Sequence, residues 1–481
     1  MINLYYFLSK FFLLIPFIPI LSNFTLNRLF GIQKIINDFS YTAFTVIAFL
    51  LLLFCNIYGQ YEFSLFNISM KNPIIFSINS FNLSFGIIFS VCIICLNYVF
   101  QNSFSFLKLI DKYRLYNRPI SFLLFFSILL IFSHNVVISM FFYIAVLLSS
   151  LFLLTNPELK EIRKGYLMTF LTGMISATIL IIIFSFYFYS NNNLIFVIQN
   201  IRNASFTSIY YVILSLILLC LTVFSFPIYK FFKEKLYYED FLPSFVIFFF
   251  PFVFLNTFLF IKITYFLFNN EFNNLGLYFY YIGFILVALF VSSAILSIFE
   301  IKNGIKFTLL FNLANFLIFL SQILFSNSDF ELIKSFSKFI IIMTAICCNI
   351  YAYSGVLFLL LNSNTTSSFL LYKERKLELN FYMLTLFTPV FLNILYFMQL
   401  NFFDFNVLYF INLIEIIVIF IVFCIFLYLF LLKTPTLNNS QNVKEVTDLD
   451  SLKFFIAPIF MFLMTIVFFY FKNDIVKIII R

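Results

Sequence analysis

Three ionisable residues lie inside or beside long apolar runs, where a charge could take part in chemistry or bind a partner. Glu415 lies within INLIEIIVIF, Lys262 lies within FLFIKITYFLF, and Lys306 lies at the start of another apolar run. A charge at the centre of a lipid-facing helix costs about 2.5–3.5 kcal/mol on insertion scales. We therefore expect Glu415 to face protein, either as a tie between helices or as a displaced relay group. Lys262 and Lys306 fit residues whose long side chains reach the membrane surface or a loop.

A second concentration of charge is the stretch FPIYKFFKEKLYYEDFLP, from Phe226 to Pro243. Its lysines and acidic residues lie between Pro227 and Pro243, with apolar runs on both sides. Two interpretations stay open: an amphipathic loop with solvated charges, or the connection behind a helix that is broken within the membrane. Broken helices at membrane depth occur where a cavity exposes backbone groups to ions or water.

The cysteines and the histidine offer little redox or metal chemistry. All seven cysteines lie in apolar runs, including Cys92 and Cys95 of the CIIC sequence, which has redox-motif spacing but no alternating strands and helices around it. His134 is the one histidine and lies near the end of an apolar run, where we expect it to be hydrogen-bonded. The sequence therefore predicts no metal cluster.

The composition identifies a membrane protein that crosses the bilayer many times. Of 481 residues, 63% are hydrophobic and 10% are charged, whereas soluble domains carry about 25% charged residues. The net charge is +9, and the basic residues are scattered through short loops. This distribution does not indicate a nucleic-acid partner. The 81 Phe residues, with no Trp, indicate an AT-rich genome such as that of an organelle.

The apolar runs set the expected elements, because a helix needs about 20 mostly apolar residues to cross the hydrocarbon core. They predict an all-α polytopic protein of about fourteen transmembrane helices, with one or two spans in the region 119–154. A polar linker, KTPTLNNSQNVKEVTDLD, covers 433–450 before the last span. The expected spans lie near 5–22, 40–58, 82–101, 119–134, 136–154, 166–189, 208–229, 243–268, 278–299, 305–325, 338–361, 380–400, 407–432 and 453–471.

Loop charges predict the orientation of these spans. Of 29 Lys and Arg residues, twenty fall in odd-numbered loops and five, Lys338 among them, fall in or beside even-numbered loops. Because Lys and Arg are enriched in the loops on the inner side, both termini are expected on the outer side.

Several stretches, in order along the chain, resemble one family: chain 2, or subunit N, of the proton-pumping NADH–quinone oxidoreductase (respiratory complex I). No motif is specific alone; the ordered set over roughly residues 130–400 carries the resemblance. The stretches are ISMFFYIAVLLSSLFLL from Ile138, KGYLMTFLTGMISA from Lys164, the frame of Pro227, Glu234 and Pro243, SIFEIKNGIKFTLLFNLANF from Ser297, and more weakly TPVFLNILYF from Thr388.

The resemblance implies a single antiporter-like membrane domain over residues 1–481, with discontinuous seventh and twelfth helices. The family's proton relay uses a glutamate in span five, lysines in spans seven and eight, and a lysine or glutamate in span twelve. These positions fall on Ala145, Thr222, Phe252 and Tyr396, none of which is a lysine or a carboxylate. The resemblance therefore implies a membrane-arm subunit whose own relay is degenerate and whose role is largely structural.

The resemblance also implies the setting. The chain would be a subunit of H⁺-translocating NADH:ubiquinone reductase, encoded and located in mitochondria, in the inner membrane with both termini toward the intermembrane space. Its partners would be other membrane-arm subunits and lipids. With neither a Gly-rich phosphate loop nor clustered cysteines, it would carry no redox site, so NADH, flavin, iron–sulfur clusters and quinone are expected on other subunits.

Three alternatives remain. One is a sister antiporter-like chain of the same complex, chain 4 or 5. Another is a lipid-linked oligosaccharide flippase, which needs basic residues lining a central cavity, whereas the basic residues here cluster in loops. The third is a membrane structural protein without transport ancestry.

Overall fold

The computed structural model describes the N-terminal third and the C-terminal end of the chain most fully. Described residues are 2–25, 30–67, 73–106, 110–134, 136–153, 171, 174–179, 181–182, 255, 258–259, 337–338, 340–349, 351–352, 355, 381–382, 384–385, 388, 392 and 448–480. The chain divides into two compact units, and we describe each by itself. The first comprises residues 1–230, 243–269 and 473–481, and the second comprises residues 231–242 and 270–472. That residues 1–481 form one domain stays a prediction.

The predicted first span is made of two helices and a short turn. Helix α1 (Ile2–Phe12) is followed by the 3-10 turn η1 (Ile15–Phe17) and by α2 (Ile18–Thr25). Pro16 and Pro19 lie in the first turns of η1 and α2, where a missing backbone N–H costs least, so each can begin a new helical segment. Residues Asn3–Thr25 are together long and apolar enough to cross a membrane.

Between the second and third spans lies a β-hairpin. Helix α3 (Phe30–Tyr58) ends at Gly59, whose φ of 84° places it in the left-handed region that closes many helices, and its N–H donates to the Cys55 carbonyl at 2.8 Å. Strands β1 (Tyr61–Asn67) and β2 (Pro73–Ile78) then pair antiparallel, with a bulge between Ser64 and Phe66. The all-α expectation was therefore wrong at this hairpin, although the described chain is mostly helical.

Two helices occupy the region in which one or two spans were expected. Helix α4 (Ser80–Phe106) comes before this region. The two helices in it are α5 (Ile110–Phe132) and α6 (Val136–Leu153), which are separated by a corner at Ser133 and His134. The corner leaves the α-helix to pair with the hairpin, because Ser133 forms a β-bridge with Phe76. Residues 119–154 therefore form two helices within the described chain, and whether each crosses the membrane stays a prediction.

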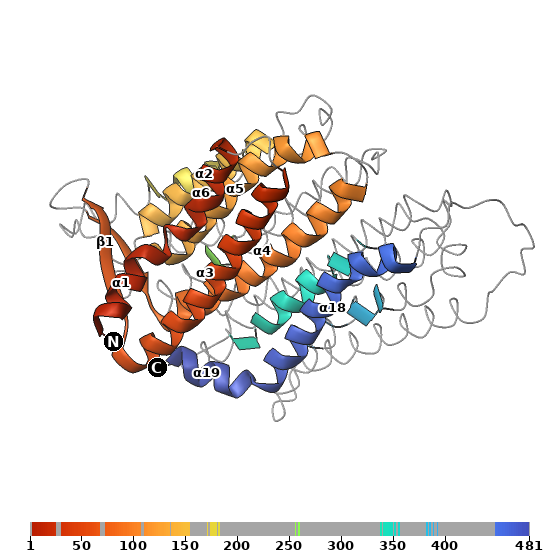
Figure 1. Ribbon diagram of the computed structural model, residues 1–481. Helices are drawn as coiled ribbons and strands as arrows, with labels where there is room; N and C mark the ends of the chain where they lie inside the picture. The colour runs from red at the N-terminus through yellow and green to blue at the C-terminus, as the bar shows by residue number, and fades with distance from the viewer. Residues whose placement is uncertain are drawn as a thin grey trace, which may run out of the picture. The chain divides into compact units, whose positions relative to one another are not determined.

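Helices α3, α4, α5 and α6 pack in chain order, with α1 against α3 and α2 against α3 and α5 (Figure 1). Aromatic rings fill the space between them. Phe12 stacks on Phe44 with ring centroids 4.3 Å apart and meets Phe132 edge-on at 5.1 Å. Gly86 of α4 allows the same ring to come close, because a Cβ there would lie 2.8 Å from Phe132 Cζ.

Side-chain contacts join the ends of the first helices. The Tyr5 hydroxyl donates to the Gly59 carbonyl at 3.0 Å, which places the start of α1 beside the end of α3. At the other end, Asn23 of α2 contacts Gln33 of α3 and Ser121 of α5. The start of α1 therefore lies beside the end of α3 and the hairpin, whereas Asn23 lies beside the start of α3. The orientation of the spans stays a prediction.

The second unit contains the last long helix, α18 (Asp448–Tyr470). Its Thr465 hydroxyl donates to Thr344 at 3.2 Å, and the Cys348 thiol donates to the carbonyl of Pro458 at 3.2 Å. These contacts join α18 to the helical residues between 337 and 352. Helix α19 (Lys472–Ile480) follows α18 in sequence, and its residues from Asn473 on belong to the first unit.

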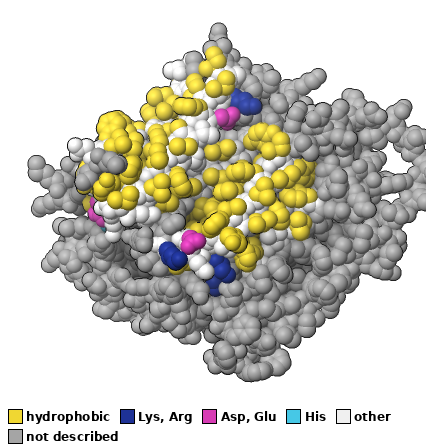
Figure 2. Space-filling view, turned by 60° about the horizontal axis from the view of Figure 1, so that its bottom comes forward, with side chains coloured by type: hydrophobic (Ala, Val, Ile, Leu, Met, Phe, Trp, Pro, Cys, Tyr) yellow, Lys and Arg dark blue, Asp and Glu magenta, His cyan; other side chains and the backbone are white. Residues whose placement is uncertain are grey.

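The described surface is that of a multi-pass membrane protein. Three described helices, Asn3–Thr25, Gly31–Tyr58 and Ser80–Val99, are long and apolar enough to span a bilayer. Figure 2 shows hydrophobic side chains covering most of the described part of one face, with few charged side chains among them. Large exposed apolar residues recur along the first three helices, for example Phe7, Phe11, Phe39 and Phe49.

The predicted spans near 40–58, 82–101, 119–134, 136–154 and 453–471 coincide with α3, α4, α5, α6 and α18. Much of the remaining region, including the predicted seventh and twelfth helices and the stretch from Phe226 to Pro243, lies largely or wholly outside the described residues. The count of fourteen spans and the two discontinuous helices stay predictions.

Candidate functional site

Helix α6 contains Ala145, the one residue of the described chain that the resemblance places at a relay position. The residue is half-buried, and its carbonyl accepts a hydrogen bond from the Ser149 hydroxyl at 2.7 Å. The sequence of α6, VVISMFFYIAVLLSSLFL, contains no Asp, Glu, Lys, Arg or His. A methyl group cannot take up a proton, so α6 offers no carboxylate or amine for a relay through the membrane.

The other predicted site residues are Thr222, Phe252, Tyr396, Glu415, Lys262 and Lys306, and all lie outside the described residues. Their assignment stays a prediction. Cys92 and Cys95 of the CIIC sequence are both buried in α4. In the described part of the chain, no group of three His, Cys, Asp or Glu side chains could hold a metal ion.

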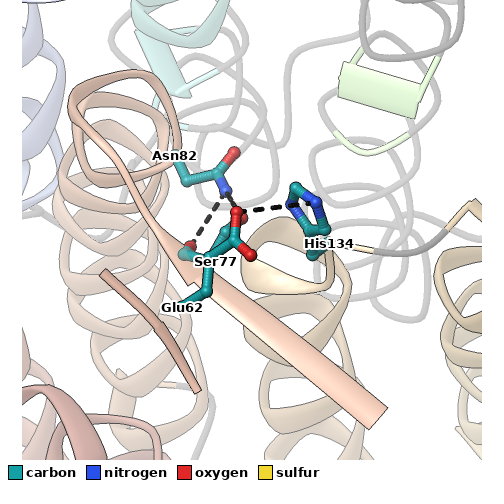
Figure 3. Close-up of polar contacts among 4 residues, drawn as sticks. All are labelled: Glu62, Ser77, Asn82 and His134. Atoms are coloured by element: carbon teal, nitrogen blue, oxygen red, sulfur yellow. Dashed lines mark hydrogen bonds and ion pairs between the residues drawn. The ribbon is translucent and has the colours of Figure 1, made fainter. Parts of the chain in front are cut away.

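A polar cluster lies where the hairpin meets the α5–α6 corner. It comprises Glu62 of β1, Ser77 of β2, Asn82 of α4 and His134 of the corner, whose side chains gather in one place (Figure 3). Glu62 and Ser77 are partners in the β1–β2 register. The hairpin and the start of α4 therefore supply three of the side chains, and His134 reaches them from a segment that is distant in sequence.

The backbone fixes most of this cluster. The N–H of His134 donates to the Ile75 carbonyl at 3.0 Å, so the corner continues the edge of β2. Asn79 caps α4, its side-chain oxygen accepting from the Asn82 N–H at 2.7 Å. The Asn82 amide then donates to the Ser77 hydroxyl and carbonyl at 2.9 and 3.1 Å.

The ionisable members of the cluster are Glu62 and His134. His134 Nε2 lies 3.6 Å from Glu62 Oε1, with the imidazole side chain 10% exposed and the carboxylate side chain 44% exposed. An imidazole in such a place can change its charge near neutral pH, and the carboxylate favours the charged form. The lone-histidine interpretation missed this partner, because no spacing rule links two residues on separate elements.

Lys338 is the residue whose setting was most misjudged from sequence, where it was counted as a basic residue at a span end. The structure leaves it only 4% exposed, in the helical segment 337–338 before Ile340–Asn349. Asn349 lies eleven positions on, about 16 Å along the same face of a helix. Its amide donates to Thr385 at 3.5 Å, so this face meets another helical segment. In the sequence, the unbroken apolar run after Lys338 was the signal that could have indicated its burial.

The described fold is similar to that of membrane subunits in two respiratory complexes. A chain of respiratory complex I from Thermus thermophilus, solved with bound NADH, aligns with a TM-score of 0.63 and 10% identity, over 97% of this chain and 99% of that chain. A chain of the membrane-bound sulfane sulfur reductase, an archaeal respiratory membrane complex, aligns with a TM-score of 0.62 and 12% identity, over 93% and 74%.

The chain shares its overall fold with these two chains of respiratory membrane complexes. No protein-family model matches its sequence, and no curated protein matches it either. At 10–12% identity the likeness is one of fold, because such distant sequences share backbone arrangement without sharing particular residues.

Proposed function

We propose that the chain is a membrane-arm subunit of a proton-pumping NADH:ubiquinone oxidoreductase, in the position of chain 2 (subunit N). The observation that supports this most is the extent of the fold match, which covers nearly the whole of this chain and of a complex I chain. The segment ISMFFYIAVLLSSLFLL from Ile138, and Pro251 directly before Phe252, favour chain 2 over chains 4 and 5. Its partners are other membrane-arm subunits and lipids, and NADH, flavin, iron–sulfur clusters and quinone bind elsewhere in the complex.

We infer further that the inherited relay of this subunit is degenerate. Ala145 in α6 supports this, since that helix contains no lysine or carboxylate. Thr222, Phe252 and Tyr396 follow the same pattern in the sequence. Bulky aromatic residues at former lysine positions fill the volume that water would need, which closes the path. The subunit then serves mainly to seat its neighbours and keep the membrane arm continuous.

Lys338 favours a second candidate function, proton transfer by a different route. An ionisable side chain buried inside a membrane protein is costly and commonly functional. Lys338 is covered by protein instead of reaching the surface, and Asn349 lies along the same helix face. Glu415, an acidic residue within an apolar run, would be a second group of such a route.

Proton-to-electron stoichiometry in sealed vesicles separates the two candidates. If the role is structural, the complex pumps fewer protons per NADH than a relative with every channel intact. Lys338→Met and Glu415→Leu then lower assembly but leave the ratio unchanged. Lys477→Met is the matched control, because that side chain is 75% exposed and pairs with Asp474 at 3.4 Å. A full ratio that collapses in the Lys338 or Glu415 variant establishes the rerouted path instead.

Location and orientation have a separate test. We propose a mitochondrial inner-membrane protein with both termini in the intermembrane space, because odd-numbered loops hold most Lys and Arg residues. A cysteine introduced at Gln60, next to the hairpin, should react with an impermeant reagent from the intermembrane side. One introduced at Lys373 should react only from the matrix side. The reverse pattern would refute the orientation. Co-purification with NADH dehydrogenase activity tests membership of the complex.

A further inference from the structure

The hairpin is attached to the α5–α6 corner by two kinds of contact. One is fixed: the bond from the His134 N–H to the Ile75 carbonyl and the bridge between Phe76 and Ser133. The other can titrate: the pair of His134 Nε2 and Glu62 Oε1 at 3.6 Å. The same corner is tied to α6, because the hydroxyls of Ser133 and Ser139 lie 2.6 Å apart.

We propose that Glu62 and His134 form a proton-responsive latch, which tightens the hairpin against the α5–α6 corner when the imidazole is charged. Around the imidazole, β1 supplies a carboxylate, whereas β2 and α4 supply the uncharged side chains of Ser77 and Asn82. The Asn82 amide nitrogen already donates to the carbonyl and the hydroxyl of Ser77. Charging the imidazole therefore strengthens its contact with β1 in particular.

The pH range of the latch follows from the imidazole. An imidazole ordinarily titrates near pH 6.5. A carboxylate beside an imidazole favours the imidazolium, so the ion pair is present at mildly acidic pH and is lost as the imidazole deprotonates at higher pH. The latch is therefore closed at mildly acidic pH and open when the imidazole is neutral.

The latch gives the proposed function a form of regulation. If the subunit lies in a proton-pumping membrane in the orientation proposed above, the hairpin faces the compartment that receives protons. Acidification there would tighten the hairpin on the helix that carries Ala145. This consequence rests on the proposed function, whereas the latch itself can be tested without it.

Hydrogen exchange of the hairpin amides in the purified, intact complex tests the latch. Exchange over β1 and β2 is measured at pH 6 and pH 8 and corrected for the intrinsic pH dependence of amide exchange. The native protein should exchange about two- to fivefold more slowly at pH 6, the size expected for one partly exposed ion pair. His134→Gln and Glu62→Gln should abolish this difference. Gln60→Ala, a change at an exposed neighbouring residue, should keep it.

A second variant distinguishes charge from shape. His134→Lys places a charge that stays on at both pH values, so the hairpin should exchange slowly at pH 6 and at pH 8. The native measurement needs no variant, so poor assembly of a mutant does not prevent a decision. The proposal is overturned if the native hairpin shows no corrected difference between the two pH values, or if the difference persists in His134→Gln. Failure here leaves the complex I assignment standing, because that assignment depends on co-purification.

Discussion

The helices of the first unit and the helices around α18 in the second unit use their polar side chains in different ways. In the first unit, the hydroxyls of Ser127 and Ser149 bond to carbonyls one turn back in their own helices, at 2.6 and 2.7 Å. In the second unit, Thr465 donates across to Thr344, and Asn349 donates across to Thr385. The buried charge Lys338 also lies in the second unit.

The difference shows what holds each set of helices together. Between the helices of the first unit, aromatic rings such as Phe12, Phe44 and Phe132 supply the contacts, and polar groups meet mainly at the helix ends. In the second unit, hydrogen bonds pass between helices within their apolar length. Lipid gives no hydrophobic drive for helices to associate, so close packing and interhelical hydrogen bonds are the two means available. Among the described residues, the first unit uses mainly ring packing away from the helix ends. The second unit uses both means, because Phe381 also meets the rings of Phe455 and Phe462 of α18.

A glycine-to-leucine change in the first unit should have the largest effect. In Gly86→Leu the new side chain meets Phe132, which is fully buried and packed on Phe12, so it cannot move aside. Overpacking of this kind costs about 1–3 kcal/mol and often more. Gly31→Leu is the control, since a Cβ there meets nothing within 4 Å. Thermal unfolding of the purified complex measures the loss of stability in each of the two variants. Equal losses in the two variants would show that packing against Phe132 does not matter.

A polar change at the helix ends of the first unit should have an intermediate effect. Asn23 of α2 donates to Ser121 of α5 and accepts from the Gln33 amide of α3. Asn23→Ala removes the partner of two buried groups, at about 1–3 kcal/mol for a group left unsatisfied. Thr25→Ala, at an exposed site where the hydroxyl bonds only within α2, should change stability by less than about 0.5 kcal/mol. Protease resistance of the α2–α3 turn reports the difference, and similar resistance in both variants would contradict it.

The sequence predicted the helices well and the contacts poorly. Runs of apolar residues located α3, α4, α5, α6 and α18, because helix length in a bilayer is set by the hydrocarbon thickness. The hairpin was not predicted from the sequence because its strands are short. Along β1, Glu62, Phe63 and Ser64 alternate between exposed and buried positions, as polar and apolar residues do in a strand. How deeply a lysine is buried depends on which other helices pack around it. A lysine at a span end and a buried lysine therefore look alike in sequence.

The candidate site divides in the same way. The absence of a carboxylate from α6 could be read from the sequence, because it depends on residue type alone, whereas the assignment of Ala145 to a relay position stays a prediction. The contact of His134 with Glu62 could not, because it depends on a corner after α5 and a strand before α4 reaching the same point. The bulge between Ser64 and Phe66 and the bridge from Phe76 to Ser133 set that meeting, and neither has a spacing signature.

The smallest predicted effect concerns the interhelical hydrogen bonds of the second unit. Thr465→Val keeps the shape of the side chain but removes the donor that reaches Thr344, whose own hydroxyl can bond to the Ile341 carbonyl at 2.8 Å. Because Thr344 keeps that partner, the loss should be about 0.6 kcal/mol, the average for such bonds within membranes. Thr388→Val is the control, since that exposed-side hydroxyl bonds only to the Leu384 carbonyl of its own helical segment. A double-mutant cycle of Thr465→Val with Thr344→Val, followed by thermal unfolding of the complex, isolates the pairwise energy. A coupling of about 2 kcal/mol or more would mean that this hydrogen bond, and not the surrounding apolar packing, dominates the attachment of α18. A coupling near zero would extend the aromatic mode of the first unit to the second and remove the contrast between them.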